Sequence, residues 1–91
     1  MIKVFFIAKI KNITEEYYDY SKRVREKAET MPGFINIISE EKDDVEITIS
    51  SWKTKEDVEA WRKDPLHMEA KAKAKEWYHW VKGIHVEAVD E

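Results

Sequence analysis

The 91-residue chain has no cysteine, only two glycines and two prolines, and no long apolar run. The absence of cysteine excludes disulfide bonds and thiolate zinc sites, and it fits a reducing compartment. No apolar stretch approaches the roughly 20 residues that span a bilayer. The scarcity of glycine and proline predicts short connections between long regular elements. We therefore expect one cytoplasmic domain over residues 1–91, without a membrane partner.

Charge of one sign is also lacking, because 16 basic and 19 acidic residues are interspersed and leave a net charge of −3. No basic patch predicts a nucleic-acid partner. What the chain does have is apolar and aromatic residues, at 43% and 12% of the sequence, which is typical of a folded domain. A domain of this size buries a modest core, so self-association would stabilise it.

Alternation and capping residues predict the order βαββααβ. The N-terminal stretch MIKVFFIAKIKN has too short an apolar core for a signal peptide and lacks a small-residue cleavage site, so it predicts a strand over residues 2–10. Further strands are predicted over residues 34–39, 45–52 and 83–89, with EEKDD as a hairpin turn. Thr14, Thr54 and Asp64 are candidate N-caps of three helices. This order favours a ferredoxin-like α+β sandwich.

A sheet with helices on one face leaves its other face to be covered. Strand alternation predicts that Phe5, Ile7, Ile35 and Ile37 lie on that second face. An exposed apolar face of this size is a liability that a second copy of the chain would remove, sheet against sheet. The sequence therefore predicts a homodimer, in which two sandwiches form a dimeric α+β barrel.

A helix over residues 65–81 would carry one apolar stripe. At about 100° per residue, that stripe consists of Leu66, Ala70, Ala74, Trp77 and Val81. His67, Tyr78 and Lys71 flank one edge of the stripe, and Trp80 lies on the opposite flank, where it can cap the barrel or meet a partner chain.

His67 is the candidate base. A helix N-terminus disfavours the imidazolium, so we expect His67 to be neutral and able to accept or donate a hydrogen bond at the edge of a pocket. From the residues alone, simple packing of its ring is the plainer explanation, and Trp61 is most simply a core residue. The spacing of His67, His79 and His85 does not match a metal site.

Several motifs together resemble the antibiotic biosynthesis monooxygenase family, the small dimeric α+β barrel proteins. The matching positions are Pro32-Gly33-Phe34, Trp52, Thr54, Trp61, His67 and Ala70. The resemblance runs from Ile2 to about Val89.

The resemblance implies a ligand cavity between helices and sheet, and a monooxygenase-like enzyme that acts on a small aromatic or quinol substrate without metal or flavin. In such oxygenases a base removes a phenolic proton, and the electron-rich anion reacts with O2. His67 would be this catalytic base. Trp61, Tyr78, Phe6 and Phe34 would line the substrate site.

Two alternatives stay open. One is a non-catalytic dimer that binds a small molecule. The other is haem binding or degradation, as in a branch of the family that uses an Asn, a Trp and a His. Trp61 matches that Trp, but Ala8 stands at the Asn position and Lys71 at the His position. We therefore expect no cofactor and rank haem below the oxygenase hypothesis.

Overall fold

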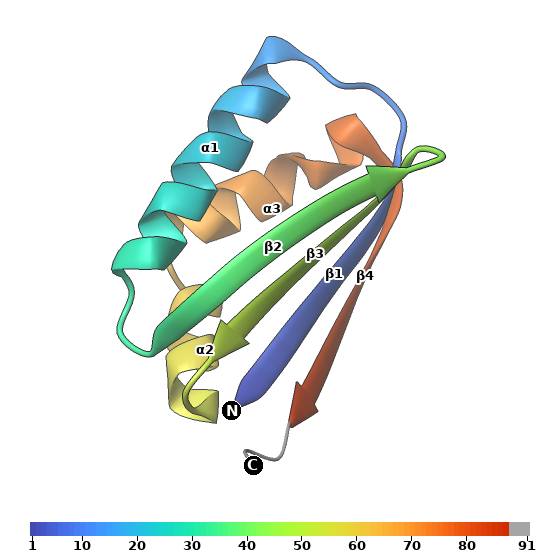
Figure 1. Ribbon diagram of the computed structural model, residues 1–91. Coiled ribbons are helices and arrows are strands. Elements are labelled where there is room, and N and C mark those ends of the chain that lie inside the picture. Colours follow the sequence, from blue (N-terminus) through green and yellow to red (C-terminus); the bar gives the residue numbers. More distant parts are fainter. Residues whose placement is uncertain (88–91) are drawn as a thin grey trace.

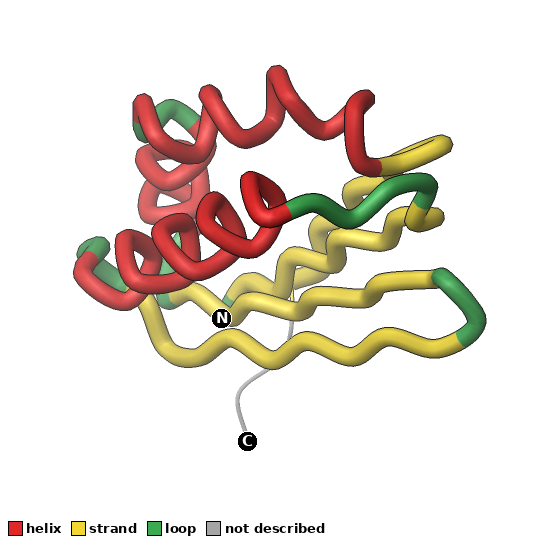
Figure 2. The backbone as a smooth tube through the Cα atoms, turned by 90° about the horizontal axis from the view of Figure 1, so that it is seen from above, coloured by secondary structure: helices red, strands yellow, loops and turns green. Residues whose placement is uncertain are grey.

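The computed structural model describes residues 1–87 and has the predicted element order. The elements are β1 (Ile2–Ile10), α1 (Glu15–Thr30), β2 (Phe34–Lys42), β3 (Val45–Trp52), α2 (Lys55–Arg62), α3 (Pro65–Trp77) and β4 (Tyr78–Glu87). The strands form one antiparallel sheet in the order β2-β3-β1-β4. The helices form a layer on one side of this sheet (Figures 1 and 2). The ferredoxin-like α+β sandwich is therefore confirmed. Ala88 and Val89 of the predicted last strand lie outside the described residues.

The three predicted caps begin the three helices. Thr14 and Thr54 each accept a hydrogen bond from a backbone N–H of the following first turn, at 3.2 Å. The Asp64 carboxylate accepts from the N–H groups of Leu66 and His67, at 3.0 and 3.2 Å. These bonds satisfy N–H groups that the helix itself leaves unpaired. They also fix His67 in the first turn of α3.

Two clusters form the core between the layers, one near each end of the sheet. The first contains Ile2, Ala28, Trp52, Val58 and Trp61. The second contains Ala8, Tyr17, Tyr20, Trp77 and Tyr78. Trp52 and Ala8 are fully buried at the centres of their clusters. Leu66, Ala70 and Ala74 pack against the second cluster, so this part of the predicted α3 stripe is confirmed.

The predicted helix over residues 65–81 is too long by four residues. It ends at Trp77, and Tyr78 pairs with Ile10 in the first bridge between β4 and β1. The backbone N–H groups of Lys11 and Asn12 donate to the carbonyl of Trp77, at 2.8 and 3.1 Å, and occupy a free carbonyl at the helix end. Pairing with β1 thus overrides local helical spacing.

Val81 and Trp80 therefore belong to β4 instead of α3. Trp80 lies opposite Lys9, on the sheet face that the helices do not cover. Trp80 is half exposed, at 49% of its surface.

Strand β2 also departs from simple alternation. The register with β3 shifts between Phe34 and Asn36, where β2 carries an irregularity. As a result, Ile37 lies opposite Ser50 on the helix side, and Ile38 lies opposite Ile49 on the outer side. The prediction that Ile37 belongs to the outer face was wrong, because a bulge reverses which side chains face outward.

The outer face of the sheet carries apolar side chains across its middle, flanked by Lys3, Lys9 and Lys82. Phe5 lies between Ile49 and Ile84, and Ile7 lies beside Ile47. The exposed apolar side chains on this face are Ile38, Ile47, Trp80, Ile84 and Val86. Within residues 1–87, no helix has both the length and the apolar character needed to cross a membrane.

Candidate functional site

A cleft of about 970 Å³ lies between the helix side of the sheet and helices α1 and α3. Aromatic residues contribute to its lining, among them Phe6, Tyr17, Tyr20, Trp61, Trp77 and Tyr78. The cleft is open because several residues that line it on α3 and β4 have small side chains or none. Ala70 and Ala74 stand on α3, and Gly83 stands on β4. The predicted cavity between helices and sheet is therefore present in the structure.

Gly83 leaves the β4 side of the cleft open. It lies opposite Phe6, so its missing side chain would point toward the helices. A Cβ built at Gly83 would have no neighbouring atom within 4 Å, and its backbone does not adopt a positive φ. A side chain at this position would consequently enter the cleft without backbone strain.

His67 lines the cleft near the start of α3. Its ring packs on Trp61, with the ring centroids 4.7 Å apart and the planes tilted by 31°. Its Nδ1 is buried and has no hydrogen-bond partner within the described part of the chain. A buried nitrogen without a partner is unfavourable, which suits a site where a ligand supplies the missing hydrogen bond.

The imidazole of His67 is held in its neutral form. Burial lowers the pKa of His67, and the charges of Lys71 and Arg62 act in the same direction, while the backbone carbonyl of Arg62 opposes them. The sequence predicted a neutral imidazole from the helix N-terminus, and the direction agrees. The main cause is desolvation.

Trp61 belongs to the core and also lines the cleft. One side of its indole stacks on the fully buried Trp52, at 5.7 Å between centroids and 25° between planes. The same residue contacts His67 and lines the cleft. It therefore connects the hydrophobic core to the imidazole and restricts where the imidazole can lie.

Tyr78 lines the cleft, but not beside His67. It follows the far end of α3, whose last residue Trp77 lies about 15 Å from His67 along the helix axis at 1.5 Å per residue. Phe6 packs edge-on against Tyr78, at 5.6 Å between centroids. Phe34 packs edge-on against Trp52 in the other cluster, so it does not join the cleft lining. Three of the four predicted lining residues thus meet at the cleft.

Glu46 is the site residue that the sequence analysis missed. Its carboxylate is buried on the helix side of β3 and accepts hydrogen bonds from the hydroxyls of Tyr17 and Tyr78, the latter at 2.9 Å. Burial raises the pKa of Tyr17 and of Tyr78 strongly, so both hydroxyls stay protonated and keep donating. We call Tyr17, Glu46 and Tyr78 the acceptor cluster.

A signal for Glu46 was present in the sequence. In VEITISSW, the residues Glu46, Thr48 and Ser50 alternate with isoleucines, and they lie opposite Ala8, Phe6 and Val4. Polar residues on the buried side of a strand suggest a lined cavity in place of a packed core.

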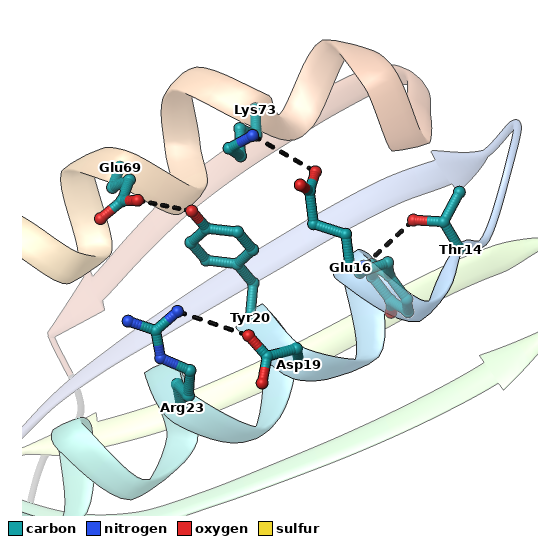
Figure 3. A network of polar contacts seen from close by, with 8 residues as sticks. Thr14, Glu16, Asp19, Tyr20, Arg23, Glu69 and Lys73 are labelled. Carbon is teal, nitrogen blue, oxygen red and sulfur yellow. Dashed lines mark hydrogen bonds and ion pairs between the residues drawn. The ribbon is translucent and has the colours of Figure 1, made fainter.

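Polar bridges connect α1 and α3 (Figure 3). The Tyr20 hydroxyl donates to Glu69, and Lys73 pairs with Glu16 at 3.3 Å. Lys73 also lies over the ring of Tyr20, 5.6 Å from its centroid. These contacts hold the two helices together above the sheet.

The donor set does not fit the haem-degrading pattern. Ala8, at the position of the Asn, is fully buried and has no polar side chain. Lys71 stands at the position of the His. Among residues 1–87, no three acidic, histidine or cysteine side chains are grouped to hold a metal ion.

Comparison with known proteins shows that the chain is similar to solved structures in its fold. No family model and no curated protein sequence matches it. A solved structure from Nitrosomonas europaea, provisionally named an antibiotic biosynthesis monooxygenase, is similar with a TM-score of 0.83 at 18% identity, over 99% of this chain and 100% of that one. Rv0793 from Mycobacterium tuberculosis gives 0.86 at 11% identity, over 99% and 96%.

SnoaB, described as a cofactor-independent oxygenase from Streptomyces nogalater, gives a TM-score of 0.82 at 12% identity, over 99% of this chain and 94% of that one. The chain therefore has the ferredoxin-like α+β fold of proteins named antibiotic biosynthesis monooxygenases, as its sequence motifs predicted.

Proposed function

We propose that the protein is a cofactor-independent oxygenase of a small hydroxylated aromatic or quinol substrate. The observation that carries this proposal is the neutral His67, whose buried Nδ1 lacks a partner, on the wall of an aromatic cleft. The fold shared with SnoaB supports the same class of reaction.

The reaction draws its electrons from the substrate. His67 takes the proton of a phenolic hydroxyl, and the resulting anion transfers electrons to O2. One oxygen atom forms a new C–O bond at a ring carbon, and the other oxygen leaves as water together with the hydrogen of that carbon and the phenolic proton. For a naphthol, one O2 thus gives one quinone and one water, without a metal, a flavin or an external reductant.

The rest of the cleft orients the ring and excludes water. Trp61 and Phe6 offer apolar surfaces, and Trp61 fixes the imidazole. Tyr78 is engaged by Glu46, so its role is to shape the far end of the cleft.

Oxygen uptake with a panel of naphthols and hydroquinones tests the proposal. His67→Ala should lower kcat by about 10²-fold or more, the usual contribution of a general base. His67→Gln keeps the volume and a hydrogen-bonding group, and it should lower kcat similarly while changing KM less. His79→Ala, an exposed histidine on β4, is the matched control and should retain activity.

The outcomes separate the alternatives. Unchanged turnover in both His67 variants would remove His67 from the mechanism. Saturable binding without turnover by the wild type would favour the non-catalytic binding protein.

We also infer that the protein is a homodimer that buries the outer face of its sheet. Exposed Ile38, Trp80 and Val86 form an apolar surface with Phe5 and Ile84. In a dimer, the same surface of a second chain packs against it and removes both from water. Sedimentation should give twice the 10.9 kDa of one chain. Ile84→Glu should yield monomers, whereas Met68→Glu, an exposed methionine on α3, should not. A wild-type monomer would contradict this inference.

A further inference from the structure

The acceptor cluster has free hydrogen-bond acceptor positions that a ligand in the cleft can use. The carboxylate of Glu46 has about four lone-pair positions, and the Tyr17 and Tyr78 hydroxyls occupy two of them. Both tyrosine protons are used inside the cluster, on Glu46 and, for Tyr78, also on the Tyr17 oxygen, so the hydroxyl oxygens have only lone pairs left. Within residues 1–87, no basic side chain forms an ion pair with Glu46.

A ligand hydroxyl binds more favourably beside the acceptor cluster than a ligand carbonyl does. A ligand hydroxyl can donate to the carboxylate and form a charge-assisted hydrogen bond. A ligand carbonyl oxygen brings no proton, so it would place lone pairs against the lone pairs of a buried carboxylate and deprive that carboxylate of water. The neutral His67, at the other end of α3, accommodates either group, because an imidazole has one donor and one acceptor nitrogen.

We propose that the acceptor cluster is a specificity site that binds the hydroxyl-bearing, reduced form of an aromatic ligand and rejects the carbonyl-bearing, oxidised form. The inference rests on the proposed function, and it specifies the substrate as a ring with hydrogen-bond donors directed at the Glu46 end. Oxidation of the ring to a quinone removes those donors. Product formation therefore weakens binding at this end of the cleft and favours release.

Burial of a carboxylate with two tyrosines also has a structural explanation, since the cluster joins α1 and β4 to β3. A structural role alone would change the binding of both forms of a ligand together. A specificity role changes the ratio of their dissociation constants, and this ratio is the quantity to measure.

The experiment is isothermal titration calorimetry under argon with 1,4-dihydroxynaphthalene and 1,4-naphthoquinone. The chain contains no cysteine, so it lacks the thiol that a quinone alkylates most readily. In the wild type, the hydroquinone should bind at least tenfold more tightly than the quinone. In Glu46→Gln, the amide can donate to a carbonyl, and the ratio should fall by about tenfold or invert.

Two further variants keep the result interpretable. Glu26→Gln is the control, because Glu26 is an exposed carboxylate on α1 that does not line the cleft, and it should leave the ratio unchanged. Tyr78→Phe removes one donor from Glu46 and frees an acceptor position, so the preference for the hydroquinone should persist or grow. Circular dichroism verifies that each variant is folded.

The failures of the two proposals are distinguishable. Equal binding of both probes by the wild type, or an unchanged ratio in Glu46→Gln, would overturn the specificity site and leave the oxygenase proposal intact. Loss of the preference in Tyr78→Phe would also count against it. Absence of binding by both probes would overturn the specificity site together with the proposed function.

Discussion

Replacing Gly83 with leucine should separate ligand binding from folding. Gly83 faces the helices across from Phe6, and a Cβ there would meet no atom within 4 Å. The leucine side chain therefore extends into the cleft without disturbing either core cluster. The free energy of unfolding should stay unchanged or rise by up to about 1 kcal/mol, because glycine weakens a strand.

The effect on ligand affinity should be much larger. A ligand that fills the cleft must shift or compress against the new side chain, and overpacking typically costs about 1–3 kcal/mol. At about 1.4 kcal/mol per factor of ten, the dissociation constant should rise by roughly tenfold to a hundredfold. Gly83→Ala adds only a methyl group and should change the dissociation constant by less than about threefold.

Calorimetric titration with 1,4-dihydroxynaphthalene and urea denaturation of the same samples measure both quantities. We predict weak binding by a leucine variant that is as stable as the wild type. Unchanged affinity in this stable variant would show that the ligand does not occupy the cleft beside Phe6. A large loss of stability would show that the space above Gly83 is closed in solution.

Further predictions concern stability. Trp52→Ala should lower the free energy of unfolding by about 3–5 kcal/mol in urea denaturation, because Trp52 is fully buried; a loss below about 1 kcal/mol would contradict its central position. Tyr20→Phe should cost about 0.5–1.5 kcal/mol by removing the hydrogen bond to Glu69, and Glu69→Gln should cost less. Burial lowers the pKa of His67 from its ordinary value of 6.5, so the unfolded chain protonates first as the pH falls. Wild-type stability should therefore decrease more than that of His67→Gln as the pH falls below about 6.5, and equal decreases would refute this.

Local signals predicted most of the fold because each one has a direct physical cause. Thr14, Thr54 and Asp64 bind free N–H groups at the helix starts, and this determines where the helices begin. Alternation of apolar residues in β1 identified its two faces. The cleft, Trp61 and His67 followed from the family resemblance together with helical spacing along α3.

The errors arose where partners distant in sequence decide the structure. Helical spacing continues past Trp77, but pairing of Tyr78 with Ile10 begins β4 there. The bulge in β2 moves Ile37 to the helix side, and no local pattern announces it. Glu46 became a site residue only when folding placed it beside Tyr78, 32 positions along the chain.

The most direct test of the central claim is the reaction of the purified, chelator-treated protein with a naphthol under isotopically labelled O2. We predict that one labelled oxygen atom enters the product and the other enters water, with no flavin, metal or reductant added. An unlabelled product, or labelling that appears only after a cofactor is supplied, would contradict the account.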